Sequence, residues 1–174
     1  MRILLVRHAE AEPGHRADGL DAARGLTDTG RRQAAAIATA MAALLDEGLH
    51  QLFASPKVRA WETAAPLAGW LPPGRQVVPL ASLAGGDPED VVADLRAVLR
   101  PASDEVVACV GHQPDLGFLA SYLTGTDPER WPARVAKASV MELTGDLARG
   151  GMRVEALLPN RYLACMAPAG DGSE

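Results

Sequence analysis

Short apolar segments that alternate with amphipathic ones constrain this chain more than any other feature. Residues 2–6, 51–54, 76–79 and 105–110 are rich in Ile, Leu, Val and Ala and have the length of buried strands. Helical spacing of apolar residues covers 28–47, the stretch after Ser55, 88–99 and 114–124. A last pair of strands, 138–143 and 152–158, predicts a hairpin. This order predicts an α/β fold: a three-layer α/β/α sandwich with a mostly parallel central sheet and an antiparallel edge.

Capping residues indicate where these helices begin. Thr27-Asp28 predicts a helix that runs to about residue 47, and Ser55 before Pro56 predicts a second helix with Ser55 as its N-cap. Pro66 then has to kink or shorten that second helix. Asp87 before Pro88 predicts the N-cap of a third.

Length, charge and cysteine content bound the class of protein. The chain has 174 residues, so we expect a single domain over residues 1–166 and a disordered tail over 167–174. A net charge of -5 argues against nucleic acid or a membrane surface as a partner. Two cysteines form no disulfide framework, and no apolar run has the length of a signal peptide core or a membrane span. We therefore expect a cytoplasmic protein.

Polar residues follow three of the predicted strands directly. Arg7-His8 follows the first, Ser55 and then Arg59 follow the second, and His112 follows the fourth. Because the carboxyl ends of parallel strands meet at one edge of an open sheet, these side chains are expected to share a crevice. Two imidazoles with two arginines suit phosphate chemistry that needs neither a metal nor a cofactor.

Each side chain then has an expected role. His8 is the candidate nucleophile, because an imidazole is largely unprotonated at neutral pH and can form a phosphohistidine that water hydrolyses. Arg7, Arg59 and the loop residue Arg24 are expected to hold the phosphoryl oxygens, and His112 to donate a hydrogen bond to them. Ser55, at the end of the second strand, is a further candidate for phosphate binding.

Four sequence blocks resemble the histidine phosphatase (phosphoglycerate-mutase-like) superfamily, in the order that this family has them. They are Leu5-Val6-Arg7-His8-Ala9-Glu10, Leu26-Thr27-Asp28-Thr29-Gly30-Arg31-Arg32-Gln33-Ala34, Ala54-Ser55-Pro56-Lys57-Val58-Arg59-Ala60-Trp61-Glu62-Thr63-Ala64 and Val110-Gly111-His112. The small size, Arg24 before the second block and the Gln-Pro after His112 are similar to SixA-type phosphohistidine phosphatases. The resemblance implies a phosphoglycerate-mutase-like fold and a phosphatase. Its implied nucleophile is His8 and its implied phosphate pocket is Arg7, Arg24, Arg59 and His112, with Asp21 at an acidic loop position of the subgroup.

Three departures from the family pattern bear on the substrate. Ala9 replaces a glycine, and Glu62 stands where the family often has glutamine. Residues 80–83 lack the glutamate that serves many relatives as a general acid. An alkoxide leaving group needs a proton, whereas the imidazole of a phosphohistidine can already carry one. The sequence therefore favours phosphohistidine in a protein, while Asp21 remains a candidate acid for an ester.

Other readings remain open at this stage. A small-molecule phosphomonoesterase of the same superfamily and a non-catalytic phosphate-binding module would both use these residues. A metal hydrolase built on His8, Glu10, Glu12 and His15 is disfavoured, because the neighbouring arginines would repel a cation. The expected partner is a phosphorylated protein or a small phosphorylated substrate.

Overall fold

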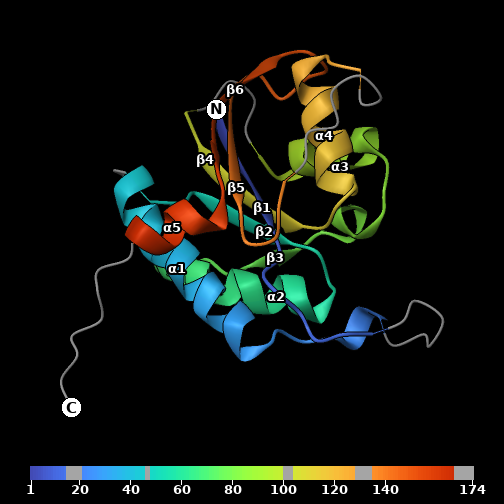
Figure 1. Cartoon of the computed structure of the whole chain (residues 1–174). Helices are drawn as coiled ribbons and strands as arrows, with labels where there is room; N and C mark the ends of the chain where they lie inside the picture. The colour runs from blue at the N-terminus through green and yellow to red at the C-terminus, as the bar shows by residue number, and fades with distance from the viewer. Residues whose placement is uncertain (15–20, 46–47, 100–103, 128–134, 167–174) are drawn as a thin grey trace.

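A six-stranded sheet runs through the middle of the molecule, with helices on both of its faces (Figure 1). This computed structural model describes residues 1–14, 21–45, 48–99, 104–127 and 135–166. The strands are β1 (Arg2–Arg7), β2 (Gln51–Ala54), β3 (Val78–Pro79), β4 (Val106–Gly111), β5 (Val140–Gly145) and β6 (Met152–Leu158). The helices are α1 (Asp28–Leu44), α2 (Val58–Ala64), α3 (Pro88–Val98), α4 (Asp115–Thr124) and α5 (Asn160–Met166). Short 3-10 turns are η2 (Asp21–Ala23), η3 (Ala65–Trp70) and η4 (Ala81–Ala84).

The strand order is β3-β2-β4-β1-β5-β6. Strands β3, β2, β4 and β1 run parallel, and β5 and β6 add an antiparallel edge. The predicted α/β architecture is therefore confirmed, including the closing hairpin. Parallel neighbours β1 and β4 end together at the centre of the sheet, where a ligand crevice is expected in such folds.

Alternation along the strands divides the core into two apolar clusters. Leu4 and Val6 of β1 pack with residues of α1, α2 and α5, whereas Ile3 and Leu5 pack with residues of α3 and α4. Successive side chains of a strand point to opposite faces, so a strand that is apolar throughout fits a sheet covered on both sides. Figure 1 shows these two helical layers on either side of the sheet.

Several predicted boundaries were wrong. Helix α2 begins at Val58 with Lys57 as its N-cap, not at Ser55, because the Ser55 amide still donates to Val110 O (2.9 Å) as an extension of β2. It ends at Ala64, and η3, which carries Pro66 near its start, continues the chain. Helix α1 ends at Leu44, short of residue 47.

One helix was not predicted, and some predictions fall outside the described residues. Seven residues form α5, too few for helical spacing to stand out, and of its apolar residues only Leu163 is buried. His15 and the tail 167–174 lie outside the described residues. That residues 1–166 form one domain stays a prediction. No helix among the described residues is long and apolar enough to cross a membrane.

The second sequence block builds the start of α1 against the segment after β1. Thr27 caps the helix by accepting from the Gly30 amide (3.0 Å), and Gln33 Oε1 accepts from the Glu10 amide (2.9 Å). A Cβ on Gly30 would lie only 1.9 Å from the carbonyl oxygen of Glu10, so only glycine fits there. This block thus holds the chain that leaves His8 rather than supplying a reacting group.

Candidate active site

The ends of β1, β2 and β4 bring three motif blocks together. Arg7 pairs with Gly111 in the sheet register, so His8 and His112 are the next residues on two neighbouring strands. Their ring centroids lie 5.1 Å apart. The His8 amide donates to Gly111 O (3.0 Å), which ties the two strand ends together. The meeting of the two histidines at one sheet edge, predicted from the sequence, therefore follows from the register.

The hydrogen bonds of His8 set its tautomer. Its Nδ1 lies 2.7 Å from the carbonyl oxygen of Ala9, and since that oxygen only accepts, Nδ1 carries the ring proton. Nε2 then carries the lone pair, which accepts a hydrogen bond from the Nε–H of Arg59 (3.3 Å). The Ala9 amide donates to Thr63 Oγ1 (3.0 Å), which holds this turn in place. His8 thus presents Nε2, the nitrogen needed for attack on phosphorus, toward the pocket.

Both imidazoles are neutral at pH 7. Burial lowers the pKa of His8 to about 4, opposed by the hydrogen bond to Ala9 and reinforced by the charges of Arg59, Arg7 and Lys137. Burial and nearby cations likewise lower the pKa of His112 to about 3. A neutral ring keeps its lone pair, so His8 meets the electronic requirement of a nucleophile.

Ser55 orients His112. It is fully buried, and its Oγ lies 2.8 Å from His112 Nε2 while accepting from the Lys57 amide (3.4 Å). When the Ser55 hydroxyl donates a hydrogen bond to Nε2 of His112, Nε2 is the acceptor and Nδ1 carries the ring proton. Nδ1 is buried without a hydrogen-bond partner in the described part of the chain. The arrangement therefore favours His112 as a donor through Nδ1.

Arg59 is the most buried of the pocket's cations. It lies near the start of α2, is 5% exposed, and reaches from the helix to His8. Its two terminal nitrogens bond to Asp21, one to the carbonyl oxygen (2.6 Å) and one to Oδ2 (3.0 Å). A buried guanidinium needs such partners, so Asp21 and the candidate nucleophile share one arginine.

Asp21 is held as a carboxylate by three cations. Arg24 bonds to Oδ1 through Nε (3.1 Å) and a terminal nitrogen (2.5 Å), and Lys57 Nζ lies 3.4 Å from Oδ2. These bonds, that of Arg24 first, hold the pKa of Asp21 well below its usual range despite partial burial. Asp21 is therefore a carboxylate at neutral pH, and its use as a proton donor to an ester stays a prediction.

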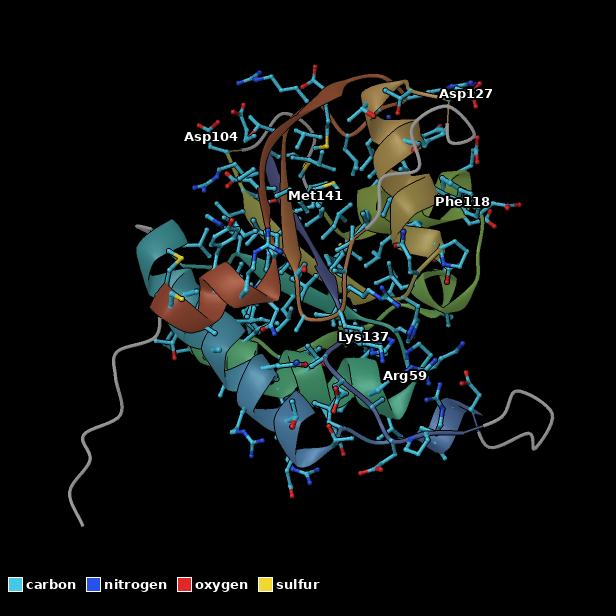
Figure 2. All side chains as sticks on the ribbon, viewed as in Figure 1. Arg59, Asp104, Phe118, Asp127, Lys137 and Met141 are labelled. Atoms are coloured by element: carbon cyan, nitrogen blue, oxygen red, sulfur yellow. The ribbon has the colours of Figure 1, made fainter. Side chains whose placement is uncertain are left out.

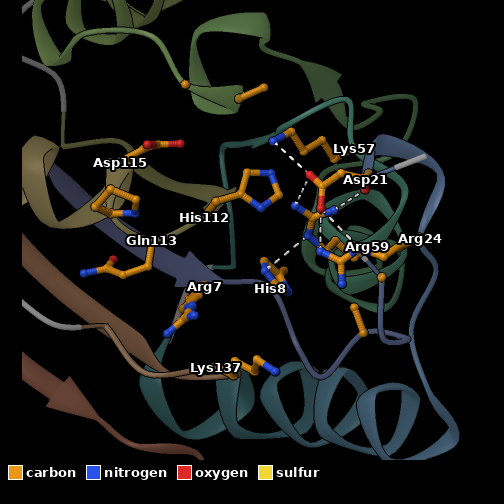
Figure 3. Close-up of a pocket in the computed structure, with 15 residues that line it drawn as sticks. Arg7, His8, Asp21, Arg24, Lys57, Arg59, His112, Gln113, Asp115 and Lys137 are labelled. Carbon is orange, nitrogen blue, oxygen red and sulfur yellow. Dashed lines mark hydrogen bonds and ion pairs between the residues drawn. The ribbon is translucent and has the colours of Figure 1, made fainter. Parts of the chain in front are cut away.

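These groups line a pocket of about 650 Å³, and Figure 3 shows them around its mouth. Its lining residues are Arg7, His8, Ala11, Gly14, Asp21, Arg24, Lys57, Arg59, Ala84, Gly85, His112, Gln113, Pro114, Asp115 and Lys137. Of the seven predicted site residues, six line the pocket. Ser55 does not, and its geometry supports orienting His112 rather than touching phosphate.

Sequence reasoning missed three charged residues of this pocket. Lys57 lies within a motif block, and its place next to Arg59 on the chain gave a signal that was overlooked. Asp115 follows the Gln-Pro pair that opens α4. Lys137 comes from a loop with no motif and no periodicity, so no sequence signal marked it. Among the described residues, no cluster of His, Cys, Asp and Glu has the arrangement of a metal site.

A family model described as histidine phosphatase superfamily (branch 1) matches residues 3–84. This span includes the first three sequence blocks, with His8 and Arg59 among them. This part of the chain, just under half of its length, is similar to the histidine phosphatase superfamily. The fourth block, with His112, lies beyond the matched span, and the structure joins it to the others through the β1–β4 pairing.

Solved structures support the SixA-type resemblance. The protein histidine phosphatase SixA complexed with tungstate aligns with a TM-score of 0.76 at 22% identity, covering 94% of this chain and 99% of that one. A protein from Nakamurella multipartitia assigned as a phosphohistidine phosphatase SixA aligns with a TM-score of 0.71 at 26% identity, covering 90% and 94%.

A third structure has a different substrate. A phosphoserine phosphatase from Entamoeba histolytica, in complex with 3-phosphoglyceric acid, aligns with a TM-score of 0.67 at 15% identity, covering 93% and 98%. No curated protein matches the chain in sequence. The family-model match supports a phosphatase, a hydrolase, and these neighbours show the predicted phosphoglycerate-mutase-like fold.

Proposed function

We propose that the protein is a metal-independent phosphatase that forms a phosphohistidine on His8 and removes phosphate from phosphohistidine in a protein. His8 supports the first step because its Nε2 is unprotonated and faces the pocket. The lone pair of Nε2 attacks phosphorus, a new N–P bond forms, and the bond from phosphorus to the substrate imidazole breaks. The departing imidazole keeps the proton that it already carries.

Hydrolysis of the intermediate completes the cycle. Water attacks the phosphorus, the bond to His8 Nε2 breaks, and inorganic phosphate leaves. The Ala9 carbonyl accepts a hydrogen bond from Nδ1–H, and this bond stabilises the positive charge that phosphorylation places on the ring. Arg7, Arg59 and His112 are the proposed ligands of the phosphoryl oxygens in both steps, since developing charge there is best met by fixed donors.

The ion pairs of Asp21 are the observation that favours phosphohistidine over a phosphate ester as the substrate. As a carboxylate bound to Arg24 and Arg59, it is unsuited to protonate an alkoxide. Residues 80–84 contain no carboxylate either. A phosphohistidine needs no proton from the enzyme when its ring is protonated, so it fits this pocket better than an ester. Arg24 serves in this proposal chiefly by fixing Asp21 and the loop, through a further bond to Glu12 O (2.7 Å).

A substrate panel tests the proposal. The rates of hydrolysis of a phosphohistidine protein, of phosphoserine and of a simple aryl phosphate are compared, with His8→Ala as control. We expect the phosphohistidine protein to have the highest kcat/KM and the folded His8→Ala variant to have none of the activity. Faster turnover of the esters would overturn the substrate class, and full activity of His8→Ala would overturn the mechanism.

Two alternative functions can be tested by experiment. A small-molecule phosphomonoesterase is favoured by the likeness to phosphoserine phosphatase and by a pocket volume typical of small-ligand sites. A non-catalytic phosphate-binding module would bind the same anion without forming a bond to His8. Trapping an acid-labile, alkali-stable phosphoenzyme that His8→Ala lacks would exclude that module. The cytoplasmic location stays a proposal, which cell fractionation tests.

A further inference from the structure

Lys137 is a pocket cation that no motif block contains and that the phosphoryl chemistry above does not use. It lines the pocket with Arg7 and His8, and its charge contributes to the lowered pKa of His8. Figure 3 shows its side chain on one side of His8, with Asp21 and Lys57 on the other. Unlike the buried Arg59, Lys137 is exposed, so it stands at the rim of the pocket.

The backbone around Lys137 is fixed to the two residues of the first motif. A terminal nitrogen of Arg7 donates to Val135 O (3.1 Å), and the Arg7 amide donates to Ser139 O (3.1 Å). The Ala138 amide donates to His8 O (3.3 Å). The backbone on both sides of Lys137 is therefore hydrogen-bonded to Arg7 and His8, and this places the lysine beside the pocket.

Ala138 adopts a backbone conformation that alanine rarely takes. Its φ is +52°, in the left-handed region, and its side chain is fully buried. Such strain persists only where the surrounding structure enforces it, and it gathers at functional sites. Here the strained residue directly follows Lys137 and turns the chain from the pocket rim into β5.

The charges in the pocket are divided unequally. Arg24, Lys57 and Arg59 all meet the carboxylate of Asp21, whereas Lys137 has no ion-pair partner among the residues that the structure describes. Figure 2 places Lys137 and Arg59 well away from the labelled Asp104 and Asp127. Five lysine and arginine side chains line the pocket against two aspartates, a net excess of three positive charges. A phosphoryl group with two negative charges leaves one of these charges uncompensated.

We propose that Lys137 binds a second anionic group of the substrate, beside the phosphoryl group that Arg7 and Arg59 hold. This inference rests on the proposed function of the same pocket. The second group is a carboxylate or another phosphate attached close to the scissile bond. In a protein substrate it is an acidic side chain next to the phosphohistidine, and in a small ester it is a carboxylate on the same molecule.

Matched substrates test this role. Two phosphohistidine peptides that differ only by Glu or Gln beside the phosphorylated residue are compared with the wild type, Lys137→Met and Lys137→Arg. We expect the wild type to prefer the Glu peptide by about three- to five-fold in kcat/KM, as for a partly exposed ion pair. Lys137→Met should lose the preference, and Lys137→Arg should keep it. Arg153→Met, which removes an exposed charge on β6, should behave as the wild type.

The contrary results are distinct. If Lys137→Met lowers kcat/KM for both peptides and the affinity for inorganic tungstate by the same factor, Lys137 binds the phosphoryl group itself and the proposal is wrong. It is also wrong if Lys137→Met retains the preference for the Glu peptide. If the wild type hydrolyses neither peptide, the proposed substrate class fails, and 3-phosphoglycerate against glycerol 3-phosphate, which lacks the carboxylate, tests Lys137 separately. Equal effects of Lys137→Met on that ester pair would then overturn the role.

Discussion

The Nε–H of Arg59 donates a hydrogen bond to Nε2 of His8 (3.3 Å), so the proposed phosphate ligand and the proposed nucleophile contact each other directly. The same guanidinium uses both terminal nitrogens on Asp21. One buried arginine thus links the nitrogen that would attack phosphorus to the carboxylate that competes with phosphate for cations. Through this link the charge of Asp21 acts on the cations that are proposed to bind phosphate.

Replacing Asp21 with Asn should strengthen anion binding. The neutral amide keeps much of the shape but removes the charge that Arg24, Lys57 and Arg59 now share. We expect the Kd for inorganic phosphate, measured by calorimetry, to fall by about three- to ten-fold, an effect on the order of 1 kcal/mol. Hydrolysis of phosphohistidine should survive. A hundred-fold loss of ester hydrolysis with loss of one limb of the pH profile would instead identify Asp21 as the acid.

Acid should destabilise the protein through His8. Its pKa is lowered to about 4 in the folded state from 6.5, so the unfolded chain binds more protons between these values. The free energy of unfolding therefore decreases as the pH falls through this window. We expect His8 to contribute a loss on the order of 2 kcal/mol between pH 7 and pH 4.5. Urea titrations of the wild type and His8→Asn at both pH values measure it, and an equal decrease in the two would contradict the assignment.

Ser55→Ala should disturb His112 without emptying the pocket. The variant removes a buried hydroxyl bonded to Nε2, which costs about 1–3 kcal/mol of stability. We expect kcat to fall by about ten-fold with little change in KM, because the donor to the transition state is misplaced. Nitrogen chemical shifts of the His112 ring report its tautomer directly. If they are unchanged in Ser55→Ala, Ser55 has a packing role only.

Glu62 is predicted to be structural, and two substitutions separate its charge from its hydrogen bond. Its Oε2 accepts from the Leu26 amide (2.6 Å), which anchors the chain between Arg24 and α1. Glu62→Gln keeps an accepting oxygen and should change the free energy of unfolding little. Glu62→Ala leaves the amide unpaired and should cost about 1–2 kcal/mol in chemical denaturation. A larger loss in Glu62→Gln than in Glu62→Ala would refute this role.

The strand ends explain why so much of the site was predictable. Apolar runs of four to six residues identified β1, β2 and β4, and parallel strands place their carboxyl ends at one edge. His8 and His112 therefore meet through local sequence and a general rule of topology. The start of α2 was placed too early, because Ser55-Pro56 has the composition of a helix start while the sheet still binds the Ser55 amide.

By itself, the sequence determined the layers of the fold and the motif residues that meet in the pocket. Burial patterns, and the order of strands and helices along the chain, can be read from local composition. Only the tertiary structure decided the protonation and partners of those residues. Asp21 is distant from His112 along the chain, and the pKa of each of these two groups depends on the charges that fold against it. The place of Lys137 in the pocket also depends on the tertiary structure, because its neighbours Val135, Ala138 and Ser139 form hydrogen bonds with Arg7 and His8 across more than a hundred residues.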